Sequence, residues 1–95
     1  MRKIIDDLKL QFDVIKEGKT YVAYCPALDL STCGKSIANA KASFSEAVDL
    51  FFETIIENNS LEETLSNLGW QIKGHKLMPP IVVTHSIHFL VLPTL

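Results

Sequence analysis

The apolar residues of this chain follow two different periods in two successive regions. Residues 8–16 alternate between apolar and polar side chains almost without interruption, and the apolar set is Leu8, Leu10, Phe12 and Val14. Such alternation predicts a strand with one buried face. Further along, apolar residues recur with the spacing of one helix face, at Phe44, Ala47, Val48, Phe51, Ile55 and Ile56. A helix with one apolar stripe can cover a sheet with one apolar face, so the two periods together predict an α+β fold.

Turn-forming residues divide the first region into three predicted strands. Gly18 lies in a short turn between the strand at 8–16 and a second strand at 20–24, which is rich in β-branched and aromatic residues. Pro26 cannot donate a backbone hydrogen bond, so it ends the second strand. Residues 29–33 lead into a third short strand, and Gly34 marks the turn after it. We therefore expect an antiparallel sheet of three or four strands.

The helical region is predicted to contain one long and one short helix on one face of this sheet. Ser36 is a suitable N-cap for a helix over 37–58, and two asparagines follow that helix. The segment Ser60-Leu61-Glu62-Glu63 has the pattern of a capping box and predicts the start of the short helix. Gly69 ends the short helix, and residues 70–73 alternate again as a possible fourth strand. The predicted order of elements is β-β-β-α-α-β.

The end of the chain is strongly apolar and is predicted to form strands. Residues 81–84 and 88–92 are rich in β-branched and apolar residues, and no charged residue follows Lys76. We divide the chain into a domain at 1–78 and a C-terminal strand or tail at 79–95. An unpaired apolar strand promotes aggregation, so we expect the tail to pack against another subunit in a dimer or tetramer. The predicted oligomer contacts are Ile87, Phe89 and Val91. Two alternatives to packing between subunits remain: the tail is a strand of its own subunit's sheet, or part of it is translated vector or frameshifted sequence.

Size and charge restrict the classes of function. The chain has 95 residues, 47% of them hydrophobic, which is enough for one domain with a modest core. Its formal net charge is -2 and its nine Lys and Arg residues are scattered, so we expect no direct binding to nucleic acid. The first residues are charged rather than apolar, and the longest apolar stretch is shorter than the roughly 20 residues of a membrane span. We therefore expect a cytoplasmic protein without membrane contact.

The residues that usually carry out catalysis or bind metals are few and dispersed. Cys25 and Cys33 lack a second pair of Cys or His at metal-binding spacing, and we expect both to be reduced thiols. His85 and His88 would lie on opposite faces of a strand. The four glycines are isolated from one another, so no phosphate-binding loop is present. We expect a protein that is not an enzyme and needs no cofactor or metal.

One segment resembles the signature of the HicB-like antitoxin family. In residues 21–36, YVAYCPALDLSTCGKS, a strand ends at a proline, a Leu-Asp-Leu stretch follows, and a glycine precedes a Ser helix cap. The similarity extends over roughly residues 8–75 and includes Leu68-Gly69-Trp70 at the end of the short helix. The chain departs from the family at residues 34–36, where many members have Gly-Asp-Thr followed by two Glu. Many members append a DNA-binding segment; only about 15 neutral residues follow Pro80 here, so we expect no such segment in this chain.

The resemblance implies a fold similar to a truncated ribonuclease H fold without its catalytic acids. It also implies a function: binding a small basic RNA-cleaving toxin of the HicA type and covering its active site, with a stable interface of about 1,600 Å². The alternative is a stand-alone HicB-like protein that binds a small molecule or acts as an accessory subunit. The candidate partner-binding residues lie where the second strand joins the third, and they are Cys25, Pro26, Leu28, Asp29 and Leu30.

Overall fold

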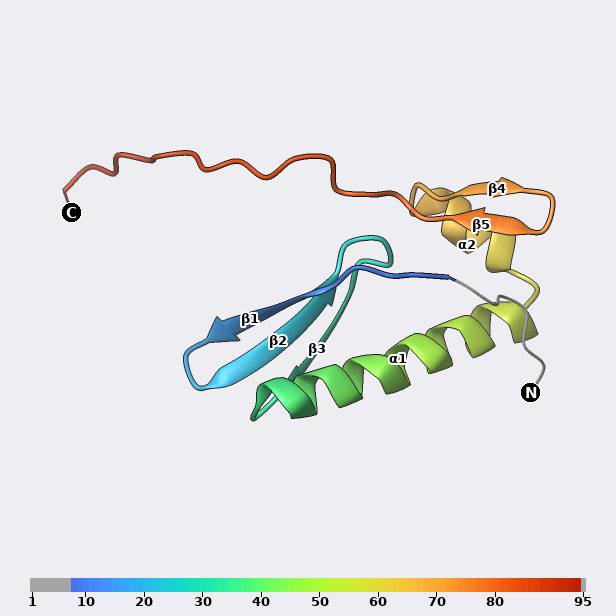
Figure 1. Cartoon of the computed structure of the whole chain (residues 1–95), viewed down its shortest axis with the longest axis horizontal. Coiled ribbons are helices and arrows are strands. Elements are labelled where there is room, and N and C mark those ends of the chain that lie inside the picture. The colour runs from blue at the N-terminus through green and yellow to red at the C-terminus, as the bar shows by residue number, and fades with distance from the viewer. Residues whose placement is uncertain (1–7, 95) are drawn as a thin grey trace.

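The computed structural model describes residues 8–94 and has the α+β architecture expected from the sequence (Figure 1). Three strands are followed by a long helix, a short helix and a two-stranded hairpin. In chain order the elements are β1 (Asp13–Glu17), β2 (Thr20–Cys25), β3 (Leu30–Gly34), α1 (Ile37–Glu57), α2 (Leu61–Asn67), β4 (Gln71–Lys73) and β5 (Lys76–Met78). The bounds of β2, β3 and α1 agree with the predicted ranges to within one residue.

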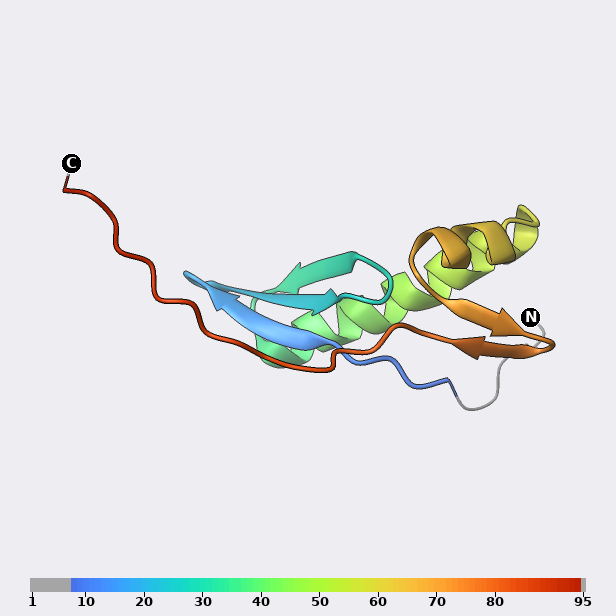
Figure 2. The same ribbon diagram turned by 90° about the horizontal axis from the view of Figure 1, so that it is seen from above.

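The main sheet is antiparallel with the strand order β1-β2-β3, and α1 covers one of its faces (Figure 2). The apolar alternation begins at Leu8, but the paired strand begins only at Asp13. Asp13 lies opposite Tyr24, and β2 ends one residue later at Cys25. Residues 8–12 thus extend beyond the end of the neighbouring strand. The prediction of a strand from residue 8 was therefore too long by five residues at its N-terminal end.

The start of α1 is held tightly against β3. The Ser36 hydroxyl accepts a hydrogen bond from the Asn39 backbone N–H at 3.0 Å, which confirms the predicted N-cap. The Thr32 hydroxyl donates to the Ala40 carbonyl at 3.2 Å. A Cβ atom at Gly34 would lie only 2.6 Å from the Ala40 nitrogen. The absence of a side chain at position 34 is what lets the helix start this close to the sheet.

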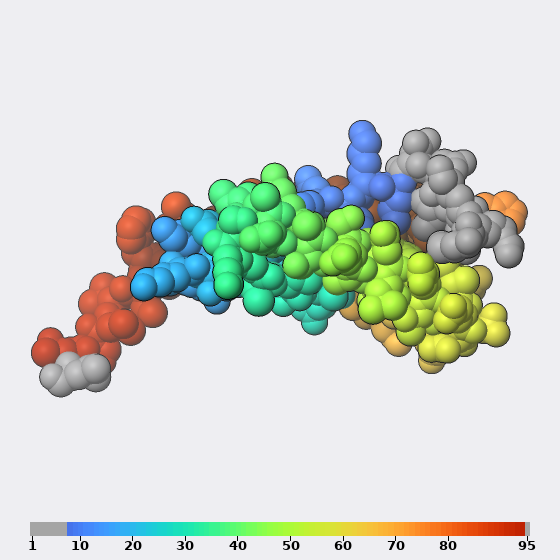
Figure 3. All heavy atoms as spheres, turned by 90° about the horizontal axis from the view of Figure 1, so that it is seen from below, coloured from blue at the N-terminus to red at the C-terminus, as the bar shows by residue number. Residues whose placement is uncertain are grey.

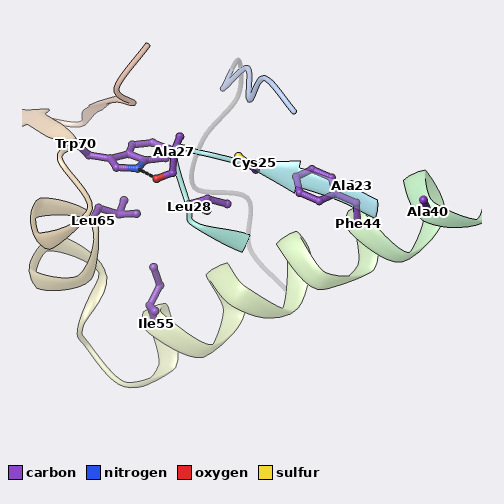
Figure 4. Packing of buried hydrophobic residues seen from close by; sticks show 9 residues of the cluster. All are labelled: Ala23, Cys25, Ala27, Leu28, Ala40, Phe44, Ile55, Leu65 and Trp70. Atoms are coloured by element: carbon purple, nitrogen blue, oxygen red, sulfur yellow. Dashed lines mark hydrogen bonds between the residues drawn. The ribbon is translucent and has the colours of Figure 1, made fainter. Parts of the chain in front are cut away.

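The core lies between the sheet and α1 and continues under α2 (Figure 4). Small β2 side chains, Ala23 and Cys25, are fully buried and leave room for Phe44 of α1. The Phe44 ring stacks on Phe12 with 4.3 Å between the ring centroids. The buried set also includes side chains from the β2–β3 connection, both ends of α1, α2 and the residue before β4: Ala27, Leu28, Ala40, Ile55, Leu65 and Trp70. Seen from below, α1 forms the outer surface of this layer (Figure 3).

The second half of the fold differs from the prediction in two details. The Ser60 side chain makes no capping hydrogen bond to α2; its hydroxyl instead donates to the Ile55 carbonyl at 3.4 Å, so the predicted capping box is wrong. The strand after Trp70 does form, but it pairs with β5 through a turn at Gly74 (φ 61°) and not with the main sheet. The sequence analysis did not predict β5. In place of a fourth strand in one sheet, the chain has a separate hairpin beside α2.

Regular secondary structure ends at Met78, so the strands expected at 81–84 and 88–92 are absent from the described chain. Residues 79–94 run along the side of the molecule and extend beyond the β1–β2 turn (Figures 1 and 2). The composition of this tail favours a strand, but a strand also needs a neighbour to pair with its backbone groups. The tail lengthens the molecule to 54 × 28 × 22 Å.

None of the helices in the described part of the chain is both long and apolar enough to cross a membrane.

Candidate protein-binding surface

The connection between β2 and β3 is a compact turn stabilised by its own backbone. The Leu28 N–H donates to the Cys25 carbonyl at 3.3 Å, and the Asp29 N–H donates to the Pro26 carbonyl at 3.2 Å. Asp29 has a φ of 50°, in the left-handed region that Asp tolerates better than most residues. The segment Pro26–Asp29, hereafter the β2–β3 turn, is therefore defined by local hydrogen bonds as well as by its neighbours.

The inner side of the β2–β3 turn is anchored in the core. Ala27 and Leu28 are buried, and the Trp70 indole N–H donates to the Ala27 carbonyl at 2.8 Å (Figure 4). Trp70 is itself buried and packs edge-on against Phe52, with 6.3 Å between ring centroids. A hydrogen bond between buried groups is costly to leave unmade, so this contact limits the conformations of the turn. The sequence analysis missed this role because no local pattern connects Trp70 with Ala27.

The outer side of the turn carries a polar contact. The Tyr24 hydroxyl donates to a carboxylate oxygen of Asp29 at 3.1 Å. This hydrogen bond, together with partial desolvation and the negative charge of Asp29, raises the pKa of Tyr24 above its ordinary value. The Asp29 carboxylate remains exposed to solvent. It offers a fixed negative charge and free acceptor lone pairs to an incoming group.

The structure separates the five candidate partner-binding residues into two groups. Cys25 and Leu28 are buried, so their side chains support the turn from inside and are not accessible at the surface. Pro26 and Asp29 are exposed, and Leu30 is partly buried. A partner that docks on the β2–β3 turn would therefore contact Pro26 and Asp29 first.

Pro26 also borders two hollows between the body and the tail. One has a volume of about 270 Å³ and lies among residues 9–11, Pro26, Ala27 and residues 79–82. The other measures about 330 Å³ and lies among residues 10–13, Pro26, Val82 and His85. The first part of the tail thus runs beside the segment that precedes β1 without packing closely against it.

The three candidate oligomer contacts lie further along the tail and are among the most exposed apolar residues. The exposed fractions of Ile87, Phe89 and Val91 are 85%, 89% and 91%. The end of the tail runs away from the β2–β3 turn, so the two groups of candidate residues belong to separate parts of the surface (Figure 1).

The described residues offer little convergence of reactive groups. Between residues 8 and 94, no three His, Cys, Asp or Glu side chains come together as possible metal ligands. Cys25 is buried and Cys33 is exposed, and both are free thiols, as expected. The exposed histidines, His75, His85 and His88, lie after the second helix and on the tail.

Comparison of the chain with models of known protein families, with curated proteins and with solved structures finds no match. The functional argument therefore rests on the residues of the chain itself and on their arrangement.

Proposed function

We propose that this protein is a cytoplasmic HicB-like antitoxin, which binds a small basic RNA-cleaving toxin of the HicA type and blocks access of RNA to it. The observation that carries the proposal is the anchored β2–β3 turn, which presents Pro26 and the charged Asp29 to solvent. This turn lies within residues 21–36, the segment that resembles the antitoxin family. A rigid turn loses little conformational entropy on binding, which favours its use as a contact surface.

Electrostatics support a basic partner. The chain carries a formal net charge of -2, and Asp29 is fixed in position by its backbone and by Tyr24. A carboxylate held in this way can accept a charge-assisted hydrogen bond from a Lys or Arg side chain of the toxin. The mechanism is occlusion: the toxin stays intact, and its RNA-binding surface is covered by the antitoxin.

The first experiment is affinity purification of the tagged protein from its host, followed by mass spectrometry of co-purifying proteins. We expect a small basic protein in stoichiometric amount, whose expression alone stops growth and whose toxicity is relieved by this chain. Recovery of the bait alone, while the neighbouring genes are expressed, contradicts the antitoxin function. It would favour the stand-alone alternative, with a small-molecule ligand or an accessory role.

The interface is tested with the pair Asp29→Asn and Asp49→Asn. Asparagine tolerates the left-handed backbone at position 29 and can still accept the Tyr24 hydrogen bond, so the substitution removes mainly the charge. Asp49 is an exposed residue of α1 and serves as the control. We expect Asp29→Asn to weaken toxin binding about tenfold, which corresponds to roughly 1.4 kcal/mol, and Asp49→Asn to leave it unchanged. Equal affinities for both variants and the wild type would place the interface elsewhere.

A further inference from the structure

Two extended segments of this chain have strand-like side-chain patterns but no strand partner. In residues 8–12, Leu8, Leu10 and Phe12 are partly buried while the residues between them are exposed. This is the burial pattern of a strand at the margin of a sheet. Within the described residues, neither 8–12 nor 79–94 forms a backbone–backbone hydrogen bond. Among residues 8–94, no strand pairs with β1 on the side away from β2, and residues 8–12 continue the line of β1 without a strand partner; residues 8–17 together are hereafter called the β1 edge.

The tail has one face that is more apolar and more exposed than the other. In an extended chain, alternate residues share a face. The odd-numbered face, hereafter the tail face, carries one histidine, His85, and five apolar side chains: Ile81, Val83, Ile87, Phe89 and Val91. The exposed fractions of these five range from 73% to 91%, and those of the three apolar residues on the opposite face, Val82, Leu90 and Leu92, are 47%, 71% and 73%. A face that is apolar at five of six successive positions is typical of a strand that is covered by another layer.

The molecule's own sheet does not extend far enough to cover this face. The first part of the tail passes the β1 edge across the two hollows beside Pro26. The end of the tail continues past the β1–β2 turn, where the sheet ends (Figures 1 and 2). The tail also runs in the same direction as β1, so pairing within one molecule would be parallel. Parallel pairing is slightly less stable than antiparallel pairing.

A second copy of the chain removes both difficulties. A twofold axis perpendicular to β1 reverses the direction of the partner's tail, which then approaches the β1 edge antiparallel. The lengths also match: the 12 residues 81–92 span about 40 Å as a strand, and the ten residues of the β1 edge span about 33 Å. Charge repulsion does not oppose this pairing. The β1 edge carries two positive residues, Lys9 and Lys16, and two negative ones, Asp13 and Glu17, and the tail is neutral.

We propose that this protein forms a twofold dimer in which residues 81–92 of each copy pair as an antiparallel strand with the β1 edge of the other. The tail face lies on the α1 side of the sheet, next to Phe12 and Val14 of the second copy. The exchange closes the β1 edge of each subunit and buries the exposed apolar side chains of both tails. The dimer is independent of the proposed toxin, and its experiments use the purified chain alone.

The first test is the molar mass of the full-length chain by light scattering at micromolar concentration. We expect a dimer for the wild type and a monomer for the double variant Ile87→Lys/Phe89→Lys, whose charges fall on the tail face. The control Ser86→Lys/His88→Lys adds two lysines to the opposite face, and we expect it to remain dimeric. Circular dichroism verifies that each variant is folded, since residues 86–89 lie outside the core. A monomeric wild type, or equal dissociation of the two variants, would overturn the proposal.

The second test distinguishes exchange from pairing within one molecule. Gln11 is exposed on the β1 edge, and the even-numbered tail residues should lie on the same side of the sheet as Gln11. In a Cys33→Ser background, Gln11→Cys is combined in turn with Thr84→Cys, Ser86→Cys and His88→Cys. We expect at least one pair to give a disulfide-linked dimer on a non-reducing gel after mild oxidation. A crosslink that forms only within the monomer contradicts the exchange. Asp49→Cys replaces Gln11→Cys as the control and should give no dimer.

Discussion

At the scale of single residues, Gly34 determines how closely α1 approaches the sheet. A Cβ atom there would meet backbone atoms of Asn39 and Ala40 at 2.8 and 2.6 Å, and backbone cannot move aside as a flexible side chain can. We expect Gly34→Ala to lower the free energy of unfolding by about 2–3 kcal/mol, measured by urea denaturation.

Gly18→Ala is the matched control for this substitution. Gly18 has a φ of 61°, but an added Cβ would have no atom within 4 Å. Its cost should therefore come from the backbone conformation alone, at about 1 kcal/mol. If Gly34→Ala costs no more than Gly18→Ala, the close packing of α1 on β3 is not what requires glycine at position 34.

The Tyr24–Asp29 pair predicts a pH dependence above neutrality. The hydrogen bond to Asp29 raises the pKa of Tyr24 in the folded state, so the neutral phenol is favoured there. Its contribution to stability is fully present below the ordinary tyrosine pKa of about 10 and is lost as pH rises through the folded pKa. We expect Asp29→Ala to shift the Tyr24 titration down toward its ordinary value.

Tyrosinate absorbance measures this titration, and a Tyr21→Phe background leaves Tyr24 as the one tyrosine. The ring at position 21, over which Lys16 lies at 5.9 Å, is kept by that substitution. An unchanged midpoint in the Asp29→Ala variant would mean that the hydrogen bond does not persist in solution.

At the scale of elements, the two helices begin in different ways. Ser36 caps α1 through its hydroxyl, and α1 has no acidic residue in its first turn to assist. We expect Ser36→Ala to lower the free energy of unfolding by about 1 kcal/mol, measured by urea denaturation. Ser45→Ala, at an exposed position inside α1, should have a slightly favourable effect because alanine is the better helix former. Similar effects of the two substitutions would contradict the capping role.

The sequence predicted those elements whose signals are local. Alternation, Gly18 and Pro26 located β1 and β2, and Ser36 with the apolar stripe located α1. The capping box at Ser60 failed, because its hydroxyl finds the Ile55 carbonyl at the end of the preceding helix. The pairing of β4 with β5, and the exposed path of the tail, depend on which backbone groups meet in space. Residue patterns within a segment do not specify that.

For the candidate site, too, the sequence predicted the local feature, a turn, but not how its side chains are oriented. The segment between Cys25 and Leu30 does form a turn at the surface, but the sequence did not distinguish the buried Leu28 from the exposed Asp29. Both lie in one short irregular stretch, where neither period 2 nor period 3.6 applies. Which side chain points inward there is decided by the left-handed backbone at Asp29 and by Trp70.

At the scale of the whole molecule, Trp70 connects parts of the fold that are distant in the chain. Its indole N–H reaches the Ala27 carbonyl across 43 positions of sequence, and its ring packs on Phe52 of α1. This residue therefore links the β4–β5 region to the β2–β3 turn, which is the proposed partner-binding surface. We expect Trp70→Phe to lower the free energy of unfolding by about 1–3 kcal/mol, because the buried Ala27 carbonyl loses its partner. Urea denaturation followed by circular dichroism measures this, since Trp70 is the only tryptophan and fluorescence would be lost.

Global stability alone does not show that Trp70 orders the turn, so hydrogen exchange at the Leu28 and Asp29 amides is the more specific measurement. Both amides donate within the turn, and local opening would expose them. Phe52→Leu is the control, because it weakens packing on the Trp70 ring without removing the indole donor. We expect both variants to be less stable and only Trp70→Phe to accelerate exchange at these two amides beyond the change in global unfolding. Equal acceleration in the two variants would mean that packing, and not the hydrogen bond, holds the turn in place.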